Sequence, residues 1–190
     1  MLESPSWISF TARVDVTQVD SIFRALNEAN VRYLVVGGMA VIAHGYVRFT
    51  KDLDVVIGLE SENVERALVA LDSIRYRPLV PVTQLAFADP IQRERWINEK
   101  HMIVFQMLDI DEPKTRLDIF VREPFDFADE YAQAFWQKYR GQDVPFVRRD
   151  TLFKMKRESG RPHDLVDIDQ ICLAKELPPY DKLPEPPSWT

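Results

Sequence analysis

The fold of this 190-residue chain is decided by the stretch Val35-Val36-Gly37-Gly38-Met39-Ala40-Val41-Ile42-Ala43-His44-Gly45-Tyr46-Val47-Arg48-Phe49-Thr50-Lys51-Asp52-Leu53-Asp54-Val55-Val56-Ile57. It predicts an apolar strand, a double-glycine turn, a short helix, a loop and a second strand. Glycine allows positive φ and a close approach of the backbone to a ligand. A helix that begins at such a turn points free N–H groups outward, so Gly37 and Gly38 are predicted to bind phosphate.

Two carboxylates open the second strand of this stretch. Strand side chains alternate between faces, so Asp52 and Asp54 are predicted to point the same way. Two carboxylates on one face repel each other unless a cation lies between them, and Mg²⁺ is the usual oxygen-ligated ion, which also bridges to phosphates. A third acid, Asp118, stands alone in the alternating apolar strand predicted over residues 115–121. If the two strands are neighbours, the three carboxylates would hold two metal ions for in-line phosphoryl chemistry.

The pattern of a glycine pair, an Asp-x-Asp pair and a later lone Asp resembles the polymerase-beta-like nucleotidyltransferase superfamily. The fuller pattern from Gly37 to Asp54 is similar to its small bacterial branch, which includes AbiEii/AbiGii-type and MenT-type toxin nucleotidyltransferases and aminoglycoside nucleotidyltransferases. The superfamily usually has Gly-Ser at the turn, whereas this chain has Gly-Gly, as many small members do. The resemblance implies an α/β (α+β) fold, in which helices flank a mixed, twisted sheet and a helical segment follows at the C-terminal end.

The resemblance also implies an activity, the transfer of a nucleoside monophosphate from an NTP to a hydroxyl acceptor with release of pyrophosphate. Asp52, Asp54 and Asp118 would be the catalytic residues and the ligands of two Mg²⁺ ions, which Mn²⁺ can replace. The acceptor stays open between RNA such as a tRNA end, a protein and a small molecule such as an aminoglycoside. A toxin role, with an antitoxin protein as partner, rests on family analogy alone. The alternative is a catalytically silent nucleotide-binding or protein-interaction module, against which the three retained carboxylates argue.

Two basic segments are candidates for contacts to the nucleotide. Arg48, Thr50 and Lys51 lie just before the acid pair, and this loop is predicted to contact a triphosphate, although its positive groups would equally serve to balance the charge of the aspartates. Residues 148–163 carry six Lys or Arg and two acids, in a chain whose net charge is −6. A glycine break in this second segment predicts two helices, over residues 150–158 and 162–175.

The second basic segment adds a further element to the resemblance. Its pattern Lys156-x₄-Arg161-x-x-Asp164-x-x-Asp167 resembles the C-terminal helical motif of the same small nucleotidyltransferases. By that resemblance, Lys156 and Arg161 belong to the nucleotide-binding residues. Lys156 would contact phosphates, while Arg161 and Asp164 would fix the helices around the cleft. The alternative is a solvated basic face in which Asp164 and Asp167 are partners within their own helix.

Composition indicates an ordinary globular chain with 46% hydrophobic and 28% charged residues. The net charge of −6 argues against broad, non-specific binding of nucleic acid. Cys172 is the single cysteine, which excludes a disulfide within the chain and fits a reducing compartment. The sequence shows neither an apolar run long enough to span a bilayer nor a signal peptide, so we expect a cytoplasmic protein with no membrane partner.

We expect three parts along the chain: a nucleotidyltransferase core over residues 1–123, a C-terminal helical part over 124–177 that closes the cleft, and a proline-rich tail over 178–190. Within the core, periodicity predicts helices over 16–30, 60–75 and 90–99, and strands over 32–36, 53–57, 101–108 and 115–121. The last two strands are expected to form a hairpin with an acidic tip.

Other residues of interest receive structural interpretations. Ser61 is a candidate N-cap of the second core helix. The aromatic residues of 125–139 recur at helical spacing, which predicts a helix with a core-facing stripe rather than a platform for bases. Cys172 is expected to lie in the core, because no histidine is placed to activate it as a nucleophile. His44 is expected to be buried or to cap its short helix, since no second ligand lies at zinc spacing, while the resemblance also allows it to line the site.

Overall fold

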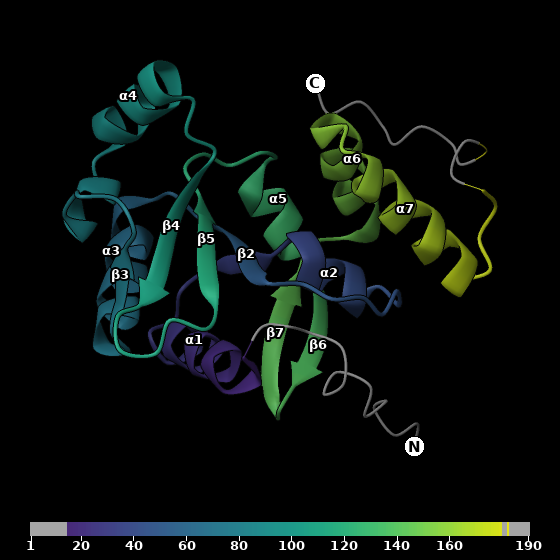
Figure 1. Ribbon diagram of the computed structural model, residues 1–190, viewed down its shortest axis with the longest axis horizontal. Helices are drawn as coiled ribbons and strands as arrows, with labels where there is room; N and C mark the ends of the chain where they lie inside the picture. Colours follow the sequence, from purple (N-terminus) through teal and green to yellow (C-terminus); the bar gives the residue numbers. More distant parts are fainter. Residues whose placement is uncertain (1–14, 180–181, 183–190) are drawn as a thin grey trace.

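One mixed sheet of seven strands runs through the computed structural model, which describes residues 15–179 and 182 (Figure 1). The strand order is β3-β4-β5-β2-β1-β7-β6. The strands are β1 (Tyr33–Val35), β2 (Asp52–Ile57), β3 (Tyr76–Pro78), β4 (Val104–Asp109), β5 (Arg116–Phe120), β6 (Phe135–Tyr139) and β7 (Gln142–Phe146). The helices are α1 (Val16–Glu28), α2 (Gly37–Ala43), α3 (Ser61–Ser73), the 3₁₀ helix η2 (Gln84–Phe87), α4 (Pro90–Lys100), α5 (Phe127–Ala132), α6 (Arg149–Ser159) and α7 (Pro162–Ala174).

The core forms where apolar stripes of helices meet the inner strands. In α1, the predicted stripe at spacings of three and four is buried, and α1 packs against α3. The alternation of β2 and β5 separates two faces: Leu53 and Leu117 are fully buried on the apolar face, while Asp52 and Arg116 lie on the other. The predicted α/β fold with a mixed sheet is therefore confirmed.

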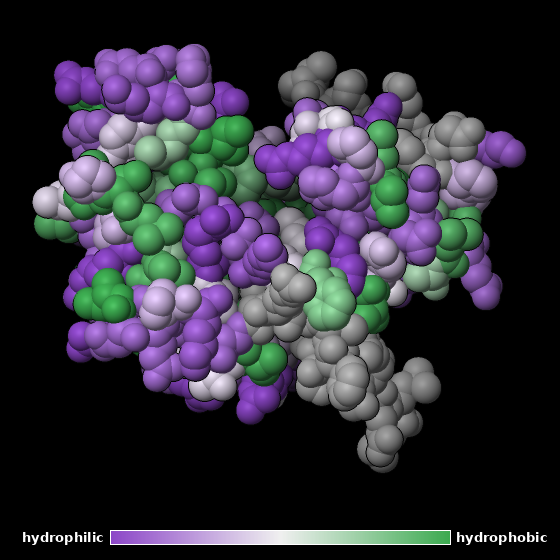
Figure 2. Space-filling model, in the orientation of Figure 1, coloured by the Kyte–Doolittle hydropathy of each residue, from purple (hydrophilic) through white to green (hydrophobic). Residues whose placement is uncertain are grey.

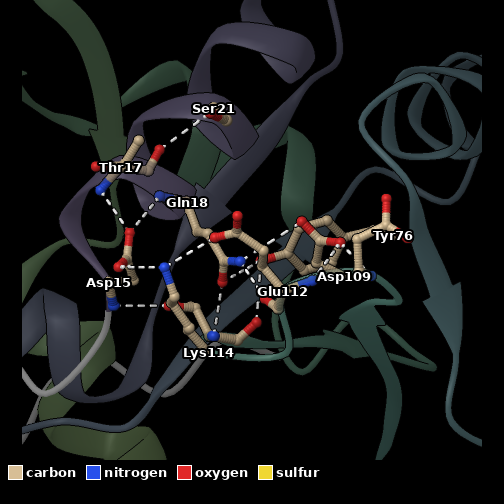
Figure 3. Close-up of polar contacts among 10 residues, drawn as sticks. Asp15, Thr17, Gln18, Ser21, Tyr76, Asp109, Glu112 and Lys114 are labelled. Atoms are coloured by element: carbon tan, nitrogen blue, oxygen red, sulfur yellow. Dashed lines mark hydrogen bonds and ion pairs between the residues drawn. The ribbon is translucent and has the colours of Figure 1, made fainter.

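The hairpin of β4 and β5 is held to α1 by a polar network (Figure 3). Gln18 accepts the Thr115 N–H at 2.8 Å, and Thr115 Oγ1 accepts the Asp15 N–H at 2.7 Å. The Tyr76 hydroxyl donates to the Thr115 carbonyl at 2.9 Å. At the tip, Asp109 accepts the N–H groups of the two acids that follow it, so this acidic segment is a hairpin turn, as predicted. The network fixes the backbone immediately before β5.

The helix predicted over residues 125–139 is wrong. Only α5 is helical there, and Phe135–Tyr139 instead form β6, which pairs antiparallel with β7. The two strands are joined by Arg140 and Gly141, whose φ angles of 47° and 86° are those of a tight hairpin turn. The aromatic spacing suits a helix, but this two-residue turn allows the segment to complete the sheet beside β1. Strands after residue 123 therefore share the sheet of the preceding part.

Smaller expectations have mixed outcomes. Ser61 is not the N-cap of α3, because the helix begins at Ser61 and Glu60 takes the cap position. The break between α6 and α7 is confirmed, with Gly160 at φ 63° and Pro162 as the first residue of α7. The proline-rich tail lies outside the described residues except for positions 178, 179 and 182. In the described ranges, no helix combines the length and apolarity needed to cross a membrane.

His44 and Cys172 lie in the core, as predicted. The His44 ring stacks on Phe135 with 4.8 Å between ring centroids, and its Nε2 lies 2.9 Å from the Val147 carbonyl oxygen. Burial lowers the pKa of His44 below its usual 6.5, with smaller effects from the hydrogen bond to Val147, which raises it, and from the charges of Arg149, Lys175 and Asp150. The folded protein thus favours the neutral ring.

This burial gives a testable pH dependence. Below pH 6.5 the unfolded chain binds a proton that the folded chain resists, so His44 should make the protein less stable as the pH falls from about 7 to about 5. We expect the free energy of unfolding in urea to fall less over this range in H44Q, whose amide can still donate to Val147. The difference is up to about 1.4 kcal/mol per unit of pKa shift. Equal pH dependence in both proteins would contradict this assignment.

Candidate active site

Three carboxylates and one arginine lie together on one face of the parallel pair β2–β5. The register places Asp54 opposite Asp118 and Asp52 opposite Arg116. Because side chains directly opposite each other in a sheet lie on the same face, the four groups are neighbours. The two strands are therefore neighbours, as the prediction of a shared carboxylate site requires.

The double-glycine turn closes over Asp54. Gly37 has φ +60°, and a Cβ atom there would lie 2.1 Å from Asp54 Oδ2. A Cβ on Gly38 would lie 2.4 Å from Thr50 Oγ1. The Gly38 N–H donates a hydrogen bond to the Asp54 carboxylate. Only glycine therefore allows the backbone of this turn to lie so close to Asp54 and to Thr50, in the loop before the acid pair.

Asp54 carries the largest electrostatic perturbation in the site. Burial, and then the charges of Asp118 and Asp52, raise the pKa of Asp54 to about 7, against the lowering effects of the Gly38 N–H and of Lys156. Burial also raises the pKa of Asp118, which Arg116 lowers and Asp52 raises. These carboxylates lack enough positive charge around them, and such perturbed groups in a cleft indicate a functional site.

Arg116 binds two of the three carboxylates. Its Nη2 lies 2.5 Å from Asp52 Oδ2, and its Nε lies 2.9 Å from Asp118 Oδ1. Gln106, opposite Asp118 on β4, lies 3.4 Å from that carboxylate. The sequence analysis did not identify Arg116 or Gln106. Arg116 stands two residues before Asp118, so the same alternation that placed Asp52 and Asp54 together could have placed it here.

The donor set fits a hard cation such as Mg²⁺ in its chemistry. Carboxylate oxygens are the ligands that Mg²⁺ prefers, and a cation beside Asp54 would favour its ionised form, which burial and then the charges of Asp118 and Asp52 disfavour. As the side chains stand, no three acidic, histidine or cysteine groups within residues 15–179 and 182 converge closely enough to hold a metal. Arg116 occupies carboxylate oxygens of Asp52 and Asp118 that a metal ion would need.

The C-terminal helices contribute a buried ionic network. Lys156 is 5% exposed, and its Nζ lies 2.7 Å from both Asp164 Oδ1 and Asp167 Oδ2. The other oxygen of Asp167 lies 2.8 Å from Arg48 Nε, in the loop before β2. Burial acts to raise the pKa of Asp164, but hydrogen bonds from Lys156 and Ser159 outweigh it and hold that pKa below its usual value. A solvated basic face is therefore wrong for Lys156, since the network links α6, α7 and the loop.

A cleft of about 1180 Å³ joins these groups. Figure 2 shows this face of the molecule indented between the lobe that carries α4 and the helices α6 and α7. Each residue predicted from the sequence to bind nucleotide or metal lines the cleft: Gly37, Gly38, Arg48, Thr50, Asp52, Asp54, Asp118, Lys156 and Arg161. The cleft also has an apolar part, which the sequence analysis missed, formed by Ile103, Phe120, Leu152 and Met155.

No protein-family model and no curated protein matches the chain, but solved structures share its fold. The antibiotic-resistance factor ANT(2'')-Ia is 17% identical with a TM-score of 0.55, over 84% of this chain and 83% of that one. The lincosamide antibiotic adenylyltransferase LnuA is 16% identical with a TM-score of 0.55, over 83% and 96%. An antigenic nucleotidyltransferase-like protein from Paracoccidioides brasiliensis is 18% identical with a TM-score of 0.50, over 83% and 75%. The chain therefore has the fold of these nucleotidyltransferases, as its motifs predicted.

The buried network yields a stability prediction. Replacing Lys156 with Met leaves Asp164 and Asp167 buried without their shared cation, which typically costs about 3–5 kcal/mol. We expect K156M to lower the free energy of unfolding in urea by about that amount. The control is K138M, which removes an exposed lysine paired with Asp143 and should leave stability nearly unchanged. Equal small losses in both variants would contradict a buried, structural role for Lys156.

Proposed function

We propose that this chain is a Mg²⁺-dependent nucleotidyltransferase that transfers a nucleoside monophosphate from an NTP to a hydroxyl acceptor. The observation that carries the proposal is the pairing of Asp54 and Asp118 in register, with Asp52 on the same face and the Gly37 turn directly above. The fold shared with adenylyltransferases supports it. A catalytically silent module, the alternative from the sequence, has no need of crowded carboxylates whose repulsion costs stability.

In this proposal, the turn at Gly37 and Gly38, at the N-terminus of α2, lies against the terminal phosphates. Asp52 and Asp54 would hold Mg²⁺, and Asp118 would complete the site of a second ion. Bound Mg²⁺, or Mn²⁺ in its place, would neutralise charge on the phosphates during an in-line displacement. Asp118 takes the proton of the acceptor hydroxyl, whose oxygen bonds to the α-phosphorus as the bond to the departing pyrophosphate breaks.

Side chains outside the acid pair, most of them positively charged, complete the proposed nucleotide site. Arg48 and Thr50 lie on the loop that runs beneath the glycine turn, and Arg161 caps α7 at the edge of the cleft. Lys156 has a third N–H beyond the two that its aspartate partners accept, and this remaining donor is available for a phosphate oxygen. The ionic network would therefore position two phosphate-binding cations, Arg48 and Lys156, through one buried carboxylate, Asp167.

The charge of the cleft bears on the acceptor. Its lining acids are the three proposed metal ligands, Asp164, which is paired with Lys156, and Glu158. This set leaves little free negative charge to bind a polycation such as an aminoglycoside. LnuA, solved with lincomycin bound, shows that the fold accepts other small molecules. Hydroxyl groups of RNA and of proteins also belong to the proposed acceptor class. A toxin role with an antitoxin partner is compatible with either of these acceptors.

The test is label transfer from each of the four α-labelled NTPs, with Mg²⁺, into RNA, protein and small-molecule fractions of a cell extract. We expect one labelled fraction and release of pyrophosphate. D54N and D118N should each reduce the rate by about 10³-fold or more, because each removes a ligand on which the whole centre depends. D111N is the matched control, since Asp111 is an exposed acid at the hairpin tip.

The outcomes separate the two candidate functions. Label transfer that survives in D54N or D118N would overturn the assigned roles. NTP binding by calorimetry without transfer or pyrophosphate release, across all fractions and NTPs, would favour the silent module. Label in a polycationic small molecule would contradict the inference from the charge of the cleft.

A further inference from the structure

Arg116 stands among the proposed metal ligands without being one. It is the first residue of β5, its side chain is 38% exposed, and it lines the cleft. Its guanidinium spans Asp52 on β2 and Asp118 on its own strand, at 2.5 Å and 2.9 Å. The pair of contacts bridges the two strands that form the site. Arginine stays charged throughout the working pH range, so only movement of the side chain can end this pairing.

The backbone at Arg116 is fixed, so the movement available is that of the side chain. Arg116 is paired with Asp52 on one side and with Leu108 of β4 on the other. The preceding residue, Thr115, is fully buried and is held by Gln18, Asp15 and Tyr76 (Figure 3). A long, partly exposed side chain on a rigid strand can leave its partners without disturbing the fold.

A divalent cation and this guanidinium require the same oxygen atoms. Arg116 donates to Asp52 Oδ2 and Asp118 Oδ1, which are oxygens of two of the three proposed ligands. Asp54, the third, has no ion pair with Arg116 among the described residues. The site thus holds one positive charge where it would accept a cation of higher charge.

We propose that Arg116 is a built-in counter-ion that takes the place of a divalent cation at Asp52 and Asp118, and that is displaced when the cation binds. The inference rests on the proposed function, since it takes these aspartates as metal ligands. Arg116 holds the carboxylates in place while no metal is bound, and it lowers the affinity for free metal because its two ion pairs must first break. It is a positioning residue, not a catalytic one.

The test measures the binding of Mn²⁺ to nucleotide-free protein. The concentration of unbound Mn²⁺ is read from its electron paramagnetic resonance signal. We expect R116Q to bind Mn²⁺ about tenfold more tightly than the native protein, because the competing cation is gone. K51Q is the matched control: Lys51 lines the same cleft and makes no ion pair within the described ranges, so its loss removes equal charge without freeing a carboxylate. Its affinity should change less than about threefold.

A thermal measurement provides a second readout. R116Q should melt at a lower temperature than the native protein without metal, since the carboxylates then lose their two ion pairs to Arg116. Saturating Mn²⁺ should raise its melting temperature by more than that of the native protein, because a ligand that binds the folded state more tightly stabilises it more. Should R116Q fail to fold, R116K keeps the charge but cannot span both carboxylates, so it should also bind Mn²⁺ more tightly.

Each result has one meaning. Equal affinity in R116Q and native protein, together with weaker binding in D54N, would overturn the role of Arg116 and leave the metal site intact. Equal tightening in R116Q and K51Q would also overturn it, as a general effect of charge. Binding of Mn²⁺ that D54N does not weaken would instead overturn the metal site, and with it the proposed function.

Discussion

Repulsion among three carboxylates on one face of two parallel strands is the constraint on which the rest of the site depends. The register of β2 and β5 brings the acids together, and the burial of Asp54 and Asp118 removes much of the water that would screen them. Three nearby groups partly offset this repulsion: the Arg116 guanidinium, the Gly38 N–H and the charge of Lys156. Even so, burial and then the charges of Asp118 and Asp52 raise the pKa of Asp54 to about 7, so the ionised form of this carboxylate stays disfavoured.

The same charges connect the two walls of the cleft. Asp167 on α7 binds Lys156 of α6 with one oxygen and Arg48 of the loop before β2 with the other. Because this carboxylate is buried, a helix movement that broke both contacts would leave its charge without a partner, at a cost of several kcal/mol. Asp167 therefore helps to hold α6 and α7 against the loop that precedes β2, together with the apolar residues of both helices that lie in the core.

The sequence analysis succeeded where a local rule sufficed. The alternation of a strand placed Asp52 and Asp54 on one face, and the glycine pair marked the turn above them. The side-by-side position of Asp118 needed the pairing of β2 with β5, which lie some 60 residues apart in sequence and which no local rule specifies. The helix predicted over residues 125–139 was wrong because the spacing of the aromatic residues is also that of a helix. The two-residue turn at Arg140 and Gly141 instead allows a hairpin. The contact of Arg116 with Asp52 depends on the same pairing of β2 with β5.

The cost of this arrangement argues for its use. A fold of this kind would be more stable with an apolar residue in place of Asp54, since burial and two neighbouring acids oppose its ionised form. The turn at Gly37 is restricted to glycine for the same reason, since its φ is positive and a Cβ there would strike the Asp54 carboxylate. Both constraints fall on the same few atoms, and the packing of the core does not need them. Electrostatically unfavourable groups gathered in one cleft are typical of a site retained for chemistry.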